Sequence, residues 1–294
     1  MESARHEPIG RLVWSILKDT GRDWSDDSAA RLAAALAYYT LLSIAPLLVI
    51  AVAVAGLAFG EDAARGQIAQ QIGSVVGAQA ADAIEAIAKN AHSPASGIVS
   101  TIIGVVVLLF GASGVFGELQ SSLNAVWEVE PKSGSGLVGL IKERFVSFTM
   151  VLGVAFLLLV SLLVSAAIAA LGHFLSSSLP GGEVLWSVLN ALISLGIVTL
   201  LFALIFKVVP DAKIAWRDVW VGAGVTALLF TVGKLLLGLY LGKSSFTSSY
   251  GAAGSVVALV VWVYYSSQIV LLGAEFTQVY ATRLGSKIKP KEAH

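Results

Sequence analysis

The sequence has little charge and no cysteine. Only 13% of its 294 residues are charged, about half the share in an average soluble domain, whereas 56% are hydrophobic. The mean hydropathy is +0.83. One soluble core could not bury so much apolar surface behind so few polar residues. These properties predict a membrane protein.

The missing residue types also exclude several kinds of site. Without cysteine the chain forms no disulfide, thiolate metal site or iron–sulfur cluster. Lys+Arg and Asp+Glu balance at 19 each, which leaves no positively charged footprint for nucleic acid. The four histidines are far apart in sequence, and none has a second histidine at metal-ligand spacing: His6, His92, His173 and His294. We therefore expect no metal, no cofactor and no nucleic-acid partner.

Six stretches are long and apolar enough to cross a bilayer as helices, which takes about 20 residues each. They cover residues 32–59, 98–117, 145–171, 184–209, 215–241 and 251–280. Of the 19 Lys and Arg, 15 fall in the segments on one side of these spans. The other side has only Arg65, Lys89 and Lys243. Because basic loops stay in the cytoplasm, the pattern predicts an all-α polytopic bundle of six transmembrane helices with both termini cytoplasmic.

The chain divides into a membrane domain and two flanking segments. Residues 1–30 form an N-terminal segment in which Ile9, Leu12, Val13, Ile16 and Leu17 recur at helical spacing, so we expect an amphipathic helix on the inner leaflet. Residues 31–283 form the transmembrane domain. Its outer loop, about 61–96, is predicted to form a short helical cap on the outer, periplasmic side. Residues 284–294 form a basic cytoplasmic tail.

Polar residues inside the fifth and sixth spans are candidates for a substrate pathway. A charge at mid-bilayer costs about 2.5–3.5 kcal/mol on insertion scales. Lys234 shares a face of small and polar residues with Thr231, so we expect it to point into the bundle; the alternative is a lysine that reaches the outer interface. Tyr265, Gln268 and Glu275 form a polar stripe. The structural alternative for Glu275 is a bond to helix ends or to an Arg of a cytoplasmic loop.

A second group of residues is predicted to act as a gate or hinge. A proline in the first span kinks a helix beside Tyr38 and Tyr39, which we count with the pathway residues. Three glycines in the second span favour close helix packing, because neither the Lys-Ser/Thr nor the strand of a phosphate-binding loop accompanies them. For every member, packing or capping remains the alternative. The gate or hinge candidates are Pro46, Gly111, Gly114, Gly117, Glu118 and Asn124.

Several tracts resemble the YihY/virulence factor BrkB family. They cover residues 33–46, 110–127, 250–254 and 272–276, in the order and spacing of that family. The resemblance implies a six-helix protein of the bacterial inner membrane with cytoplasmic termini. Members once carried the label ribonuclease BN, and some are tied to serum resistance or envelope lipid traffic. The family has no settled catalytic motif, so the resemblance implies no active site. It includes Tyr38, Tyr39, Pro46, Glu118, Asn124, Trp127, Gly251 and Glu275, but not Lys234.

The sequence favours a transporter-like protein that translocates or handles a lipid-like or amphipathic envelope substrate without its own ATPase. The alternative is a structural protein that organises envelope assembly. An enzyme, including a ribonuclease, is not favoured, since the cytoplasmic loops are short and carry no cluster of carboxylates or histidines. Asp211 and Asp218 are interpreted as helix caps. The expected partners are membrane lipids, with a homo-oligomer or other envelope proteins left open.

Overall fold

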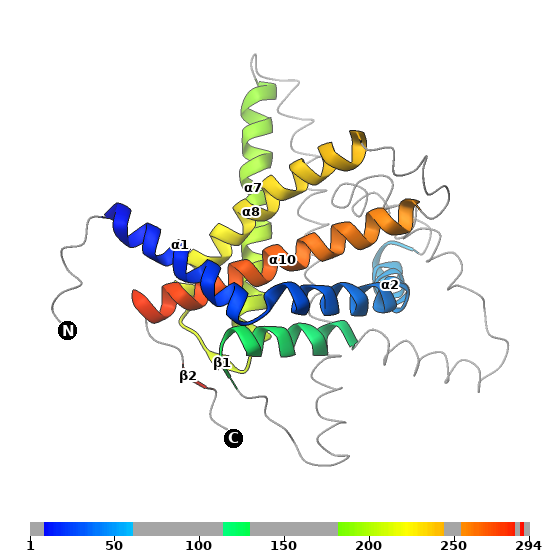
Figure 1. Cartoon of the computed structure of the whole chain (residues 1–294). Helices are drawn as coiled ribbons and strands as arrows, with labels where there is room; N and C mark the ends of the chain where they lie inside the picture. The colour runs from blue at the N-terminus through cyan, green and yellow to red at the C-terminus, as the bar shows by residue number, and fades with distance from the viewer. Residues whose placement is uncertain (1–8, 61–113, 130–181, 244–253, 286–288, 291–294) are drawn as a thin grey trace, which may run out of the picture.

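The computed structural model describes residues 9–60, 114–129, 182–243, 254–285 and 289–290, and these are almost entirely helical (Figure 1). An unlabelled helix covers residues 114–126. The labelled elements are α1 (Ile9–Asp26), α2 (Ala29–Phe59), α7 (Gly182–Val208), β1 (Ala212–Lys213), α8 (Trp216–Lys243), α10 (Gly254–Arg283) and β2 (Lys289–Pro290).

Four of the six predicted spans are confirmed as helices. The predicted ranges 32–59, 184–209, 215–241 and 251–280 correspond to α2, α7, α8 and α10. Within the described residues, three stretches are long and apolar enough to cross a membrane: Ala191–Val208, Trp216–Leu239 and Val256–Arg283. The ranges 98–113 and 145–171 and the outer cap lie outside the described residues. The helical membrane fold is thus confirmed, whereas the count of six spans stays a prediction.

α8 packs against both α7 and α10, and α10 also packs against α2 and α1. A row of aromatic rings connects α7, α8 and α10. Phe206 stacks on Phe202 of α7 with centroids 6.2 Å apart, and Phe202 meets Phe230 of α8 edge to face at 5.6 Å. Phe230 in turn meets Trp262 of α10 at 6.1 Å. Such ring pairs add specific geometry to the area that they bury.

The contact between α8 and α10 is built on two glycine–threonine pairs. A Cβ added at Gly222 would overlap the Thr277 side chain, and one added at Gly273 would overlap Thr226. Each threonine hydroxyl donates to the glycine carbonyl one turn earlier in its own helix, over 2.7 Å for Thr226 and 2.6 Å for Thr277. The hydroxyls are therefore satisfied, and the small residues let two antiparallel helices approach closely.

A short ordered connection joins the C-terminal end of α7 to the N-terminal end of α8. β1 pairs with β2 in antiparallel register, Ala212 opposite Pro290 and Lys213 opposite Lys289. The Lys207 ammonium donates to the Ile214 carbonyl and lies 5.7 Å from the centre of the Trp216 ring.

The core of the bundle lies next to this connection and combines residues of α2, α7, α8, α10 and the 114–126 helix, among them Ala33, Leu123, Trp127, Phe206, Val219, Ala223 and Leu271.

α1 covers the segment expected to form an amphipathic helix, and it meets α10 near the C-terminal end of that helix (Figure 1). Ile16 is buried, whereas Val13, Trp14 and Leu17 are exposed. Ser28 has a φ of 55° in the turn that follows α1. This left-handed backbone, rare for residues other than glycine, turns the chain from α1 into α2.

Candidate functional site

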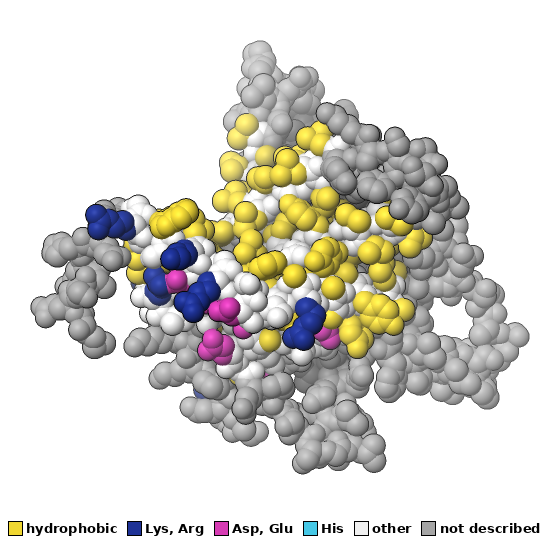
Figure 2. Space-filling view, viewed as in Figure 1, with side chains coloured by type: hydrophobic (Ala, Val, Ile, Leu, Met, Phe, Trp, Pro, Cys, Tyr) yellow, Lys and Arg dark blue, Asp and Glu magenta, His cyan; other side chains and the backbone are white. Residues whose placement is uncertain are grey.

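Apolar and charged side chains occupy different parts of the surface in Figure 2. Apolar side chains cover α7, α8 and α10, whereas most of the charged ones gather over α1 and its surroundings. On α8 the exposed apolar residues are Leu228, Leu229, Val232, Leu235, Leu236 and Leu239. Two features depart from this division. One is a lysine on the apolar face, and the other is a buried acid beside α1.

The lysine on the apolar face lines a shallow hollow between α8 and α10. Gly233 of α8 lets Tyr265 pack closely against that helix, because a Cβ there would lie only 2.7 Å from the Tyr265 ring. The ring of Trp262 forms part of its wall. We call this feature the α8–α10 hollow, and its lining residues are Phe230, Lys234, Leu237, Trp262, Tyr265, Ser266 and Ile269.

The inward orientation expected for Lys234 stays a prediction, because the predicted spans at 98–113 and 145–171 lie outside the described residues. Lys234 and Thr231 are exposed, and the Thr231 hydroxyl donates to the Ala227 carbonyl over 2.7 Å. The stripe of α8 that packs against α10 includes Gly222 and Gly233 instead. Small residues occur on both sides of α8, and the shape of α10 selects the stripe that is buried. Lys234 nevertheless meets Tyr265, a second predicted pathway residue, in the hollow.

Other predicted residues are distributed over α2 and α10. Tyr38 and Tyr39 are exposed and meet edge to face with centroids 5.7 Å apart. Gly114 lies against Tyr39, whose Cδ1 would be 3.4 Å from an added Cβ. The backbone of α2 stays helical through Pro46. Gln268 is half-buried. Glu118 is half-buried, Gly117 has open space beside it, and Gly111 lies outside the described residues.

Asn124 ties the 114–126 helix to the connection between α7 and α8. Its amide nitrogen donates to the Asp211 carboxylate over 3.0 Å, and its amide oxygen accepts from the Asp211 backbone N–H over 2.8 Å. Gln120 donates to the same carboxylate over 3.2 Å. Asp211 therefore accepts from another helix and is not simply a cap for α8. Asp218, in the first turn of α8, is buried against Gly285.

Glu275 is the most unusual polar residue in the described part of the chain. Its side chain is fully buried, and neither carboxylate oxygen has a hydrogen-bond partner there. The structural alternative, a bond to a helix end or an Arg, is therefore not found among the described residues. Among the described residues, the charged groups that act on it are acids: Asp27, Asp23 and Glu128. Together with Asp26, which acts on Asp23 and Asp27, we call these residues the acidic cluster.

The pKa values of Asp23 and Asp27, which lie outside the spans, are raised. Burial raises the pKa of Asp27, the contact with Glu275 lowers it, and the charges of Glu128, Asp23 and Asp26 raise it further. Burial also raises the pKa of Asp23, with added repulsion from Asp26 and Glu128. Both effects follow from the cost of placing like charges together away from water.

Backbone geometry brings Glu128 into the acidic cluster. Its φ is 50°, and it ends the 114–126 helix in the left-handed position where glycine is usual. The Glu128 N–H donates to the Ala125 carbonyl over 3.0 Å, and the Val129 N–H donates to the Asn124 carbonyl over 2.9 Å. These two bonds define a Schellman motif. A glutamate in this position carries a conformational penalty of about 1–2 kcal/mol.

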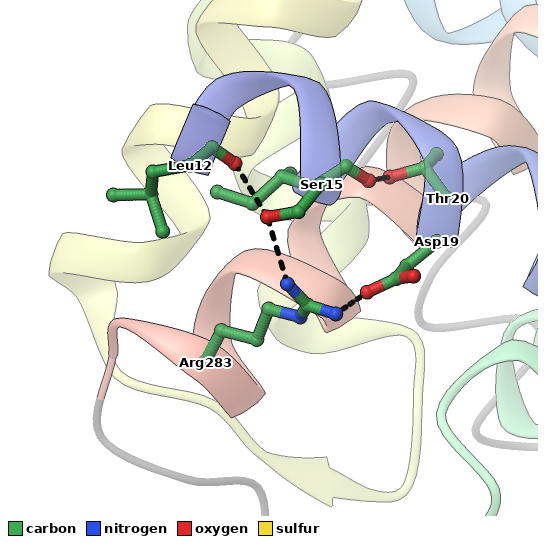
Figure 3. A network of polar contacts seen from close by, with 6 residues as sticks. Leu12, Ser15, Asp19, Thr20 and Arg283 are labelled. Atoms are coloured by element: carbon green, nitrogen blue, oxygen red, sulfur yellow. Dashed lines mark hydrogen bonds and ion pairs between the residues drawn. The ribbon is translucent and has the colours of Figure 1, made fainter. Parts of the chain in front are cut away.

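A group of polar contacts, which we call the polar latch, fastens α1 to α10 (Figure 3). Arg283, the last residue of α10, donates to the Ser15 hydroxyl over 2.9 Å and forms an ion pair with Asp19. Ser15 donates in turn to the Leu12 carbonyl over 2.9 Å. The latch joins the helix nearest the N-terminus to the last helix of the bundle.

Sequence reasoning singled out Glu275 but missed Asp23, Asp27 and Glu128. The available signal was the run Asp23-Trp-Ser-Asp-Asp27, which is unusually acidic for a chain with so little charge. The acidic cluster does not form a metal centre with the described residues. None of them form a group of three or more His, Asp or Glu able to hold an ion.

Comparisons with known proteins agree with the architecture. The family model described as virulence factor BrkB matches residues 20–294. A UPF0761 membrane protein of Tolumonas auensis is 37% identical over 183 residues, covering 60% of this chain and 57% of its own length. One from Psychrobacter is 25% identical over 95% of this chain and 49% of its own length. One from Alteromonas mediterranea is 28% identical over 91% of this chain and 87% of its own length.

The chain thus spans about half to three-fifths of the length of two of these curated relatives. The names of all three describe membrane proteins, and none names an enzyme. No solved structure matches the chain. Because the family model covers nearly all of the sequence, the chain belongs to the YihY/virulence factor BrkB family of membrane proteins.

Proposed function

We propose that this protein translocates or handles a lipid-like or amphipathic substrate of the bacterial envelope without an ATPase of its own. The observation that carries the proposal is the α8–α10 hollow. It places Lys234 beside Trp262 and Tyr265, on two helices of membrane-spanning length. An ammonium group attracts a phosphate or carboxylate headgroup, while aromatic and aliphatic walls accept acyl chains. The lining of the hollow therefore combines the two kinds of group that an anionic amphiphile would contact.

The orientation that we propose is six spans in the inner membrane with both termini in the cytoplasm. Its first support is the excess of Lys and Arg on one side of the predicted spans, 15 against 3. Its second support is the latch, which brings α1 and the C-terminal end of α10 to the same end of the bundle. Membrane lipids would then be the immediate partners of the apolar faces.

The test is flux of a labelled anionic phospholipid in proteoliposomes. Lys234→Gln should lower the rate roughly 10- to 100-fold, because a hydrogen bond to a charged group is worth about 1.5–3 kcal/mol. The matched control is Lys18→Gln, which removes an exposed lysine of α1. Wild-type flux no faster than in protein-free liposomes would refute transport. Equal rates for the two variants would refute the role of the hollow.

Single cysteines in this cysteine-free chain test the hollow independently of flux. Lys234→Cys is expected to react with a membrane-impermeant maleimide, and an anionic amphiphile should slow that reaction. Glu275→Cys should stay silent, because residue 275 is fully buried. Gln268→Cys, at a half-buried position, should react more slowly than residue 234. Labelling at 275 together with silence at 234 would contradict the proposed pathway.

One observation favours the second candidate, a scaffold for envelope assembly. α1 exposes Val13, Trp14 and Leu17, whose side chains are 50%, 70% and 52% accessible. This face would hold α1 on a membrane surface or on a partner protein. A scaffold predicts no flux from the wild-type protein, together with loss of co-purifying envelope proteins in Trp14→Ala. Flux that depends on Lys234 would exclude the scaffold as the main function.

A further inference from the structure

We propose that Asp27 and Glu275 form a carboxyl pair that binds one proton, and that this proton joins the α1–α2 turn to α10. The inference does not depend on the proposed transport. It rests on residues outside the α8–α10 hollow, and its experiment measures no flux.

The geometry of Glu275 carries the proposal. Both of its carboxylate oxygens are buried and lack a hydrogen-bond partner among the described residues. Asp27 lies between α1 and α2, both of which pack against α10, and its carboxyl group interacts with that of Glu275. Two ionised carboxylates offer only acceptors, so they make no hydrogen bond with each other. One proton on either group supplies the missing donor and turns a repulsive contact into an O–H···O bond.

Among the described residues, no positive charge lies where it could replace this proton. Asp23 and Glu128 act on Glu275 with the same sign as Asp27. Arg22 lies beside Asp23 but forms its ion pair with the exposed Asp26, over 3.5 Å.

The charged groups of the other packed elements are directed elsewhere. Arg31 of α2 and Arg217 of α8 are exposed, and Asp218 lies against Gly285. Lys207 of α7 donates to a backbone carbonyl, and Arg283 of α10 bonds Asp19 and Ser15.

A proton fits the pair better than a metal ion does. Calcium and magnesium need about six or more oxygen ligands, and the described residues contain no group able to hold a metal. A proton needs only the two facing oxygens. It also lowers the charge of the pair from −2 to −1, which reduces the cost of burying Glu275. Asp27 is partly exposed, so the proton enters from water through its side chain.

Proton binding at this pair is expected to affect how α1 is held. Asp27 directly follows α1, and α1 also contacts α10 through the Arg283 latch. Removing the proton leaves two like charges in contact at one end of this interface, while the latch still holds the other part. We therefore expect the turn, and the end of α1 that leads into it, to loosen at high pH.

Infrared difference spectroscopy on the full chain in lipid nanodiscs tests the proton directly. Raising the pH should remove a carbonyl band of a protonated carboxylic acid. The band should be absent in Glu275→Gln and in Asp27→Asn, which keep side-chain volume. It should persist in Asp26→Asn, the matched control, because that carboxyl is exposed and paired with Arg22.

The result is decisive in either direction. A band that is missing from the wild type, that survives in Glu275→Gln, or that disappears in Asp26→Asn would overturn the proposal. Removal of the band by NaCl at constant pH would show that the pair prefers Na⁺ to a proton, which also overturns it. A second measurement covers the case in which Glu275→Gln does not fold. A spin label at Lys18→Cys should become more mobile as the pH rises, and Asp27→Asn should abolish that change.

Discussion

Replacing Gly222 by alanine tests the close approach of α8 to α10. A Cβ at residue 222 would overlap the hydroxyl, the methyl and the Cβ of Thr277, and both helix backbones hold these atoms in place. Overpacking of a tight interface costs about 1–3 kcal/mol. The substitution also gains about 1 kcal/mol of helix propensity, which any Gly→Ala change in a helix interior would gain.

Gly224 provides a matched control on the same helix. An added Cβ there meets nothing within 4 Å, so Gly224→Ala should gain the propensity without the overlap. The difference in unfolding free energy between the two variants therefore isolates the overlap, roughly 1–3 kcal/mol. Melting of the detergent-solubilised chain, followed by tryptophan fluorescence, measures it as a drop in Tm of about 2–4 °C per kcal/mol.

Compensation at residue 277 sharpens the test. Thr277→Ala leaves the Thr277 Cβ position occupied, only 2.6 Å from a Cβ at residue 222, so it should not rescue Gly222→Ala. Thr277→Gly empties that position and should recover most of the loss, which a double-mutant cycle detects as a coupling energy. If Gly222→Ala melts at the same temperature as Gly224→Ala, the reasoning about the interface is refuted.

Four further predictions concern the other end of the bundle. Asn124→Ala should lower the unfolding free energy by about 1–3 kcal/mol in thermal melts, because it leaves the Asp211 carboxylate and N–H short of partners. Arg283→Gln should release α1, and limited proteolysis should then cleave within residues 9–26 sooner than in the wild type. Burial, as the main cause, raises the pKa of Asp27 above its ordinary 3.8, so the folded chain holds more protons than the unfolded one above that pH. Stability should therefore fall as the pH rises through the raised pKa, and Asp27→Asn should flatten that slope in melts taken across pH. Glu128→Gly should raise the Tm by removing about 1–2 kcal/mol of backbone strain and one repulsive charge, and an unchanged or lower Tm would contradict this account of the turn.

The sequence was a good guide to the helices because span length depends on composition alone. The range 215–241 was predicted where α8 runs from Trp216 to Lys243, and 32–59 where α2 runs from Ala29 to Phe59. Any run of about 20 apolar residues must satisfy its own backbone in lipid, which forces a helix whatever its neighbours are. Such predictions need no knowledge of tertiary contacts.

Which face of α8 would be buried could not be predicted in the same way. Small residues lie on the face of Gly224 and Lys234 as well as on the face of Gly222 and Thr226, so the sequence of α8 alone does not distinguish them. The deciding information lies on α10, where Gly273 and Thr277 repeat the same order and spacing. Only an antiparallel pairing of the two Gly-x-x-x-Thr tracts identifies the buried stripe.

The environment of Glu275 was also beyond sequence reasoning, which placed it in a polar stripe and offered a bond to a helix end or an Arg as the alternative. Its neighbours are instead two acids that are far apart in sequence. Asp27 comes from the turn after α1 and Glu128 from the end of the 114–126 helix. The positions of Asp27 and Glu128 depend on left-handed backbone at Ser28 and Glu128. Serine and glutamate rarely adopt this conformation, so the sequence does not predict it. Glycine would adopt either conformation without penalty, and at residue 128 it would also remove a carboxylate from the cluster. A chain that has only 19 acidic residues and keeps one of them in a strained turn, beside a fully buried glutamate, tolerates two destabilising features at one place. The latch at Arg283 and the packed core offset these two features. Because acids with raised pKa lie at this end of the bundle, its stability should depend on their protonation.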